Sequence, residues 1–138
     1  MIATSTIIYL IVMVGSIIIS SEIKNFIDLP SIILFFVPLV AILTSKYQPH
    51  EIRAHLVNAV NNKPKSGIKT ADTIKFFSFI SKISLLLGLQ ISFTYSISAI
   101  SKLENLSAIQ GAITICVLPL FYAFSINGII YVLTIKIK

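Results

Sequence analysis

The chain has 138 residues, of which 56% are hydrophobic and only 12% are charged, and its formal net charge is +6. A soluble domain of this size carries about a quarter charged residues, and one small core could not enclose so much apolar surface. The composition also excludes intrinsic disorder, because disordered chains are poor in apolar residues. It predicts an all-α membrane protein.

The first predicted helix covers residues 2–21, which carry no charge and are long enough to cross a bilayer at roughly 20 residues per crossing. This stretch lacks the basic start and the small-residue cleavage pattern of a signal peptide. We therefore expect a retained transmembrane helix.

The second predicted span covers residues 29–46 and is apolar on all sides, although it contains Pro30 and Pro38. A strand would avoid both prolines, whereas a membrane helix tolerates proline where neighbouring helices cover the freed carbonyl. Pro30 falls in the first turn, where its missing N–H costs nothing, and Asp28 or Ser31 can cap the free N–H groups there. Pro38 lies in mid-helix and predicts a kink.

The connection over residues 46–71 is expected in the cytoplasm. Basic residues concentrate in and beside it and at the C-terminus, and the positive-inside rule assigns such segments to the cytoplasmic side. They are Lys46, Arg53, Lys63, Lys65, Lys69, Lys75, Lys136 and Lys138. Both termini are then cytoplasmic, and the net charge needs no nucleic-acid partner.

Within this connection, the residues after Pro49 predict a short amphipathic helix, at the inner membrane surface or continuing the second span. Its apolar side consists of Ile52, Leu56, Val57 and Val60. His50 and His55 are five residues apart and do not share a helix face. With no cluster of cysteines or carboxylates beside them, we interpret both as solvated residues rather than zinc ligands.

The third predicted span covers residues 72–101, with an N-cap available near Thr70–Asp72. Small side chains recur every four residues along one face, at Ser84, Gly88, Ser92 and Ser96, and a second polar line contains Gln90, Thr94 and Ser98. Small residues at this spacing let helix backbones approach closely in a membrane. A helix–helix contact is therefore predicted, with an aqueous path as the alternative.

The fourth predicted span covers residues 106–135, with Pro119 near its centre. Asn127 should face protein or water rather than lipid, and we expect an interhelical hydrogen bond there rather than ligand binding. Cys116 is interpreted as a packing residue. No Asp, Glu, Lys, Arg or His lies near the middle of a span, and no nucleophile–base pairing or phosphate loop is present. The sequence therefore predicts neither an enzyme nor a bound cofactor.

Three segments together, "FIDLPSIILFF", "YQPHEIRAHLVNAVNN" and "LENLSAIQGAITICVLPLFYAFSINGIIY", resemble the MotA/PomA stator subunits of the wider MotA/TolQ/ExbB proton-channel family. That family has a similar Phe-hydrophobic-Asp-x-x-Ser start of the second span, then a proline and an amphipathic helix. A Leu-Asp-Asp-Pro-x-Ala-Ile-like turn precedes a fourth span with a Phe-Tyr-Gly-like centre. Here the turn is matched by Leu103, Glu104, Ala108 and Ile109, and the centre by Phe121 and Tyr122.

The chain departs from this family in two ways. The 46–71 connection is too short for the large cytoplasmic domain that engages the rotor in flagellar stators. Where stators carry a Thr-Thr pair in the fourth span, this chain has Pro119 and Leu120, although the third-span threonine is matched by Ser92.

The resemblance implies a homopentamer in the bacterial inner membrane, around two copies of a single-span partner of the MotB/ExbD type. The partner would supply the ion-binding Asp, and H⁺ or Na⁺ would be the transported ion. Asp28 and Ser31 would then lie at the outer rim. The candidate ion path in this chain consists of Ser92, Thr114 and Asn127.

Two other functions stay open at this point. The chain could be a non-conducting scaffold derived from MotA, as the missing threonines allow. It could also be an unrelated small transporter of the multidrug type, but that class is expected to carry an acid in its first span, and residues 2–21 contain none.

Overall fold

The computed structural model describes residues 2–19, 27–60, 68–100 and 106–137. In these ranges the chain forms five helices and no strand, which confirms the predicted all-α class. The helices are α1 (Ile2–Ile19), α2 (Leu29–Lys46), α3 (Pro49–Val60), α4 (Thr70–Ile100) and α5 (Leu106–Ile137). The expectations for Lys63, Lys65, Leu103, Glu104 and Lys138 fall outside the described residues.

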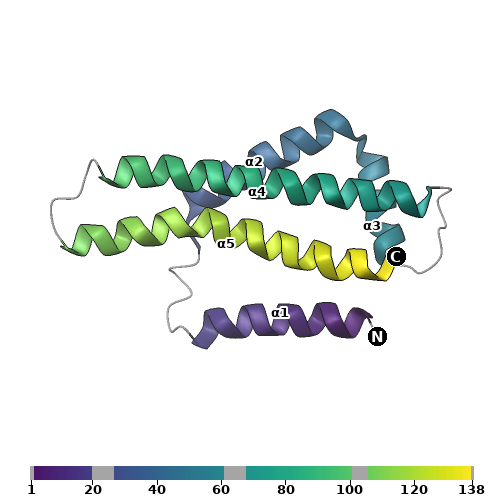
Figure 1. The fold of residues 1–138 in the computed structure, drawn as a ribbon, viewed down its shortest axis with the longest axis horizontal. Helices are drawn as coiled ribbons and strands as arrows, with labels where there is room; N and C mark the ends of the chain where they lie inside the picture. The colour runs from purple at the N-terminus through teal and green to yellow at the C-terminus, as the bar shows by residue number, and fades with distance from the viewer. Residues whose placement is uncertain (1, 20–26, 61–67, 101–105, 138) are drawn as a thin grey trace.

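The long helices α4 and α5 lie side by side and antiparallel, and α1 lies along α5 (Figure 1). α2 packs against both α4 and α5, and α3 crosses the end of the bundle where α4 begins. Ala108 and Ile109, expected in a turn, already belong to α5.

Among the described residues, three helices are long and apolar enough to cross a membrane, which indicates a membrane protein. They are Leu29–Lys46, Thr70–Ile100 and the part of α5 from Gly111 to Ile135. In α1 the corresponding apolar stretch among the described residues is shorter, Ile7–Ser16.

α2 begins and ends where its sequence provides the signals. Asp28 has an extended backbone, and its carboxylate accepts a hydrogen bond of 2.9 Å from the Ser31 N–H, as predicted for the N-cap. Pro30 occupies the first turn and Pro38 lies inside the helix. At the other end Tyr47 is extended (φ −127°, ψ 138°), which separates α2 from α3. The short helix therefore does not continue the second span.

α3 has its own start signal. Pro49 is its first residue, and the Gln48 N–H donates a 2.8 Å hydrogen bond to the Glu51 carboxylate, as in a capping box. α4 begins at Thr70, so Thr70 is a helical residue and not the N-cap, and Asp72 lies in the first turn.

In the part of the chain that the structure describes, two clusters of buried apolar residues hold the helices together. One joins α2 to α4 and α5 through Phe35, Leu39 and Ala123. The other lies where α3 meets α4 and α5 and contains Ala59, Phe76, Phe77 and Ile130. Elsewhere many large apolar side chains are exposed, as a lipid environment allows.

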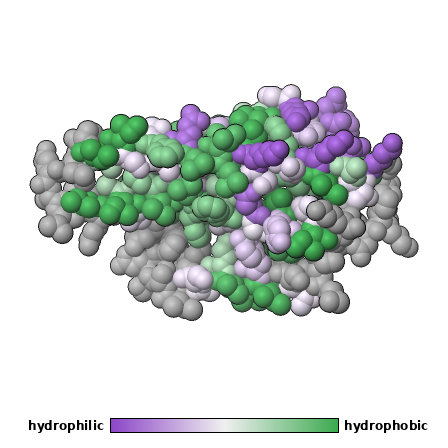
Figure 2. Space-filling view, in the orientation of Figure 1, coloured by the Kyte–Doolittle hydropathy of each residue, from purple (hydrophilic) through white to green (hydrophobic). Residues whose placement is uncertain are grey.

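The ends of the bundle differ in polarity. Figure 2 shows hydrophobic side chains over the end away from α3, and hydrophilic ones gathered toward the end that carries α3.

α2 has 18 residues, or about 27 Å, close to the thickness of a bilayer core. Its last residue, Lys46, lies with Nζ 3.7 Å from the centre of the Phe79 ring. The first turns of α4 therefore extend past the end of α2, beside α3.

Candidate functional site

The face of small residues on α4 lies against α5. Ser84, Gly88 and Ser92 are buried, and a Cβ atom at Gly88 would lie 2.6 Å from the Ala123 Cβ and 3.0 Å from the Pro119 carbonyl oxygen. Real Cβ atoms do not approach other atoms so closely, so this crossing requires glycine. We call this contact, formed by Ser84, Gly88 and Ser92 of α4 with Pro119 and Ala123 of α5, the α4–α5 seam.

Ser96 continues the line but is only half-buried. Its hydroxyl donates a 2.8 Å hydrogen bond to the Ser92 carbonyl within α4. Gln90, Thr94 and Ser98, on the second polar line, are exposed. The two lines predicted from the sequence therefore differ in environment, and only the first enters the seam.

A polar cluster forms at one end of the seam. The Asn127 amide donates hydrogen bonds to the Ser84 hydroxyl at 2.9 Å and to the Ala123 carbonyl at 2.8 Å, and it accepts one from the Ser81 hydroxyl. This is an interhelical hydrogen bond of the kind expected for Asn127. Ser81 was not predicted, although its position three residues before Ser84 places it on an adjacent part of the helix surface.

Ser92 has a different environment. Its side chain is 7% exposed, and its hydroxyl has no hydrogen-bond partner among the described residues. Pro119, on the other side of the seam, is fully buried and lacks an N–H, so the Ile115 carbonyl loses its helical donor. A buried hydroxyl without a hydrogen-bond partner costs free energy of folding. This part of the seam therefore favours the binding of a polar group, such as water or a side chain of another protein.

The three candidate ion-path residues do not form one enclosed site. Ser92 is buried in the seam, Asn127 is bonded to Ser81 and Ser84, and Thr114 is exposed. A path through all three would need surfaces from another chain.

The N-terminal end of α2 forms a second polar position. The phenol of Tyr122 is hydrogen-bonded to the backbone of Asp28, and its ring lies 6.1 Å from that of Phe35. Ser31 is fully buried there, and its hydroxyl has no partner in the described part of the chain. These residues fix the start of α2 against the centre of α5.

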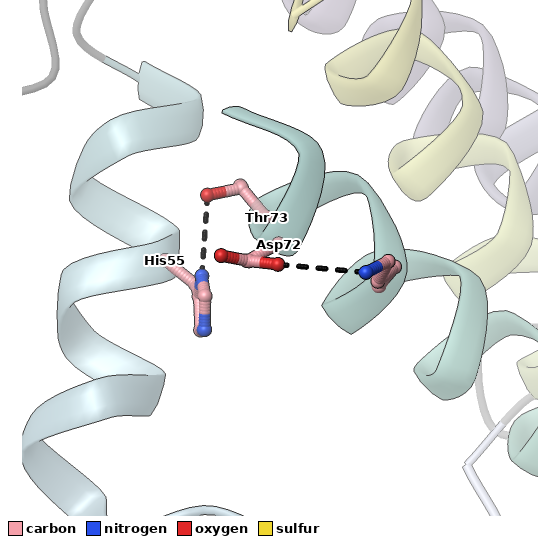
Figure 3. A network of polar contacts seen from close by, with 4 residues as sticks. His55, Asp72 and Thr73 are labelled. Carbon is pink, nitrogen blue, oxygen red and sulfur yellow. Dashed lines mark hydrogen bonds and ion pairs between the residues drawn. The ribbon is translucent and has the colours of Figure 1, made fainter. Parts of the chain in front are cut away.

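At the opposite end, His55 joins α3 to α4. The side chain is 6% exposed, and Nδ1 lies 3.2 Å from the Thr73 hydroxyl. The imidazole stacks on Phe76 (4.6 Å between centres, 17° between planes) and meets the Tyr47 ring edge-on. Figure 3 shows the ring between the two helices, with Asp72 beside it. The prediction of a solvated His55 was wrong, because α4 provides both its polar partner and a flat surface for its ring.

Burial lowers the pKa of His55 below its ordinary value of 6.5, while the carboxylates of Glu51 and Asp72 act in the opposite direction. Asp72 is itself exposed and paired with Lys75 at 3.7 Å. His50 is exposed, and no group of three or more metal-binding side chains occurs among the described residues.

A groove of about 550 Å³ lies between α4 and α5 toward the end that carries α3. Its polar lining comes from Ser78, Ser81, Asn127, Tyr131 and Thr134. It leads from the first turns of α4 to the polar cluster around Asn127. Tyr9 of α1 contacts Gly128, another residue of this groove. α1 therefore packs on the side of α5 that lines the groove.

A smaller groove of about 220 Å³ lies at the far end of the pair. It is apolar and includes Ala99, Ile113, Cys116 and Val117. Cys116 is half-buried among these side chains.

No protein-family model, curated protein or solved structure matches the chain.

Proposed function

We propose that the chain is the membrane subunit of a MotA-like, ion-driven motor complex. α1, α2, α4 and α5 span the bacterial inner membrane, with both termini and α3 in the cytoplasm. Five copies surround two copies of a single-span MotB/ExbD-type partner, whose Asp binds the H⁺ or Na⁺ that is transported.

The observation that carries this proposal is the α4–α5 seam. It contains a buried, unpartnered hydroxyl at Ser92. From Ile83 to Ile100 and from Gly111 to Ile135, however, neither helix has an Asp, Glu, Lys, Arg or His. A path for protons or cations normally requires such a group in the membrane. The seam is therefore suited to assist a carboxylate that another chain supplies.

The exposed surface supports an assembly. Large apolar side chains of α4 and α5 are exposed, and Ile97 is 71% exposed. Further members of this surface are Leu86, Phe93, Phe124 and Tyr131. A ring of subunits around a central partner would cover part of it and leave the rest to lipid.

The charge distribution supports the orientation. Lys46, Lys69 and Lys75 all lie at the end that carries α3, which the positive-inside rule assigns to the cytoplasm.

The second candidate is a non-conducting scaffold, and the polar cluster favours it. The amide of Asn127 is already engaged by Ser81, Ser84 and Ala123, so it has little capacity left for an ion. In this function the same assembly holds the partner in place without transport.

Ion flux into proteoliposomes separates the two functions. With a candidate partner co-reconstituted, we expect flux that disappears when the partner's Asp is replaced by Asn. The double variant Ser92→Ala plus Thr114→Val should reduce this flux several-fold while the complex keeps its mass, because only hydroxyl groups are lost. Undiminished flux in the double variant would remove these residues from the path, and an intact complex without any flux would leave the scaffold function.

A further inference from the structure

α3 has two different faces. One, with Ile52, His55 and Ala59, packs against the bundle. The other is exposed although it is apolar, and its members are Leu56, Val57 and Val60. Val60 is 65% exposed. The apolar side predicted from the sequence is thus divided, since only Ile52 belongs to the packed face.

The contacts of α3 show which way the exposed face points. α3 crosses the end of the bundle, so its axis lies across that of α4 (Figure 1). Residues at different angles around α3 therefore face different levels along the axis of α4. His55 contacts Thr73 in the first turn of α4 as well as Phe76, whereas Ala59 clusters with Phe76 and Phe77 and has no contact in that first turn among those described, so its contacts lie nearer the membrane-spanning part.

Successive residues of a helix are rotated by about 100°, so Ala59 lies about 40° from His55 in one sense. Leu56 and Val60 lie further around α3 in the same direction, at about 100° and about 140° from His55. Leu56 and Val60 of the exposed apolar face are therefore directed toward the bilayer. Glu51 lies about 40° from His55 in the opposite sense and is directed away.

Positive charge accompanies this face. Arg53 is exposed and lies about 160° from His55, beside Val60. Lys46, at the end of α2, is exposed at the same end of the bundle. A helix with apolar side chains and a cation on one side binds in the interface of membranes that contain anionic lipid.

We infer that α3 is a lipid-binding helix: Leu56 and Val60 enter the interface of the cytoplasmic leaflet, and Arg53 binds the anionic headgroups of phospholipids there. This inference rests on the membrane-spanning part of the proposed function and not on ion transport. In this inference, the short connection between the second and third spans holds the cytoplasmic end of the bundle at the membrane surface.

The chain contains no tryptophan, so a single Trp reports its own depth. We would reconstitute Val60→Trp into vesicles whose lipids carry bromine near the headgroup, in neutral and in anionic lipid. The fluorescence should be quenched at least two-fold more than that of Ala54→Trp, which lies about 120° from Val60 and about 160° from Leu56 around α3. Anionic lipid should increase the quenching, and Arg53→Gln in the Val60→Trp background should remove that increase.

Val37→Trp, at mid-length on the exposed side of α2, tests the membrane span separately with bromine deep in the acyl chains. Quenching of Val37→Trp without quenching of Val60→Trp would overturn the lipid-binding inference and leave the span intact. If the quenching of Val60→Trp depends neither on anionic lipid nor on Arg53, the proposed contact between Arg53 and the headgroups is refuted. If neither tryptophan is quenched, the spanning arrangement fails and the inference fails with it.

Discussion

Gly88→Leu is expected to separate α4 from α5 and to abolish the folded protein in the membrane fraction. Even a Cβ atom at this position would lie 2.6 Å from Ala123, and the rest of a leucine side chain would have to enter the backbone of α5 at Pro119. Overpacking typically costs on the order of 1–3 kcal/mol, and more where two backbones must part. Because proteins are marginally stable, yield and melting temperature in detergent should fall sharply.

Gly111→Leu is the matched control, since nothing lies within 4 Å of a Cβ atom placed there. It carries the same change of side chain in α5 and should retain nearly normal yield. A milder pair tests the contact itself: Ala123→Gly should partly restore the stability lost in Gly88→Ala, because the Ala123 Cβ is the nearest atom. Equal behaviour of Gly88→Leu and Gly111→Leu would show that the helices do not pack along the seam.

Acidification is expected to loosen α3 from α4. Because burial lowers the pKa of His55 below 6.5, the undocked state, in which the ring is hydrated, binds a proton more tightly than the docked state. The docked state is therefore favoured fully above about pH 6.5, and it is weakened as the pH falls from that value through the lower pKa of the docked ring. Glu51 and Asp72 reduce this effect without reversing it.

Hydrogen exchange of the α3 amides measures this undocking outside the membrane-spanning segments. We expect exchange, corrected for its intrinsic dependence on pH, to accelerate several-fold on acidification. His55→Phe keeps a flat ring against Phe76 but cannot titrate, so its exchange should not respond to pH. His50→Phe, at the exposed histidine, should behave like the unmodified chain. An unchanged acid response in His55→Phe would assign the effect to another group.

Much of the fold could be predicted because its signals are local. The bounds of α2 follow from Asp28 and Pro30 at its start, and its hydropathy indicates a membrane helix. The spacing of four between Ser84, Gly88 and Ser92 indicated a close helix contact, and it is along this line that α4 meets α5.

The environment of His55 could not be predicted, because it depends on tertiary contacts. Its hydrogen-bond partner Thr73 lies 18 residues away, and the ring of Phe76 comes to its face only when α3 crosses the first turns of α4. Neither residue carries a sequence signal that links it to a histidine.

The division of the apolar side of α3 was also beyond the sequence. A hydrophobic pattern shows that one side of a helix is apolar, but it does not show whether that side is buried by protein or by lipid. Ile52 proved to pack against the bundle, whereas Leu56, Val57 and Val60 stay exposed. The contact of Tyr9 with Gly128 similarly depends on where α1 lies against α5.

The central proposal, a ring of subunits around a membrane partner, is tested most directly by native mass spectrometry of the complex isolated through a tag on this chain. Extraction should be mild, and the mass should be read before and after controlled dissociation. We predict five copies of the chain with two copies of one smaller protein that has a single apolar span containing Asp. A lone chain, or an assembly of this chain with no second protein, would contradict the proposal.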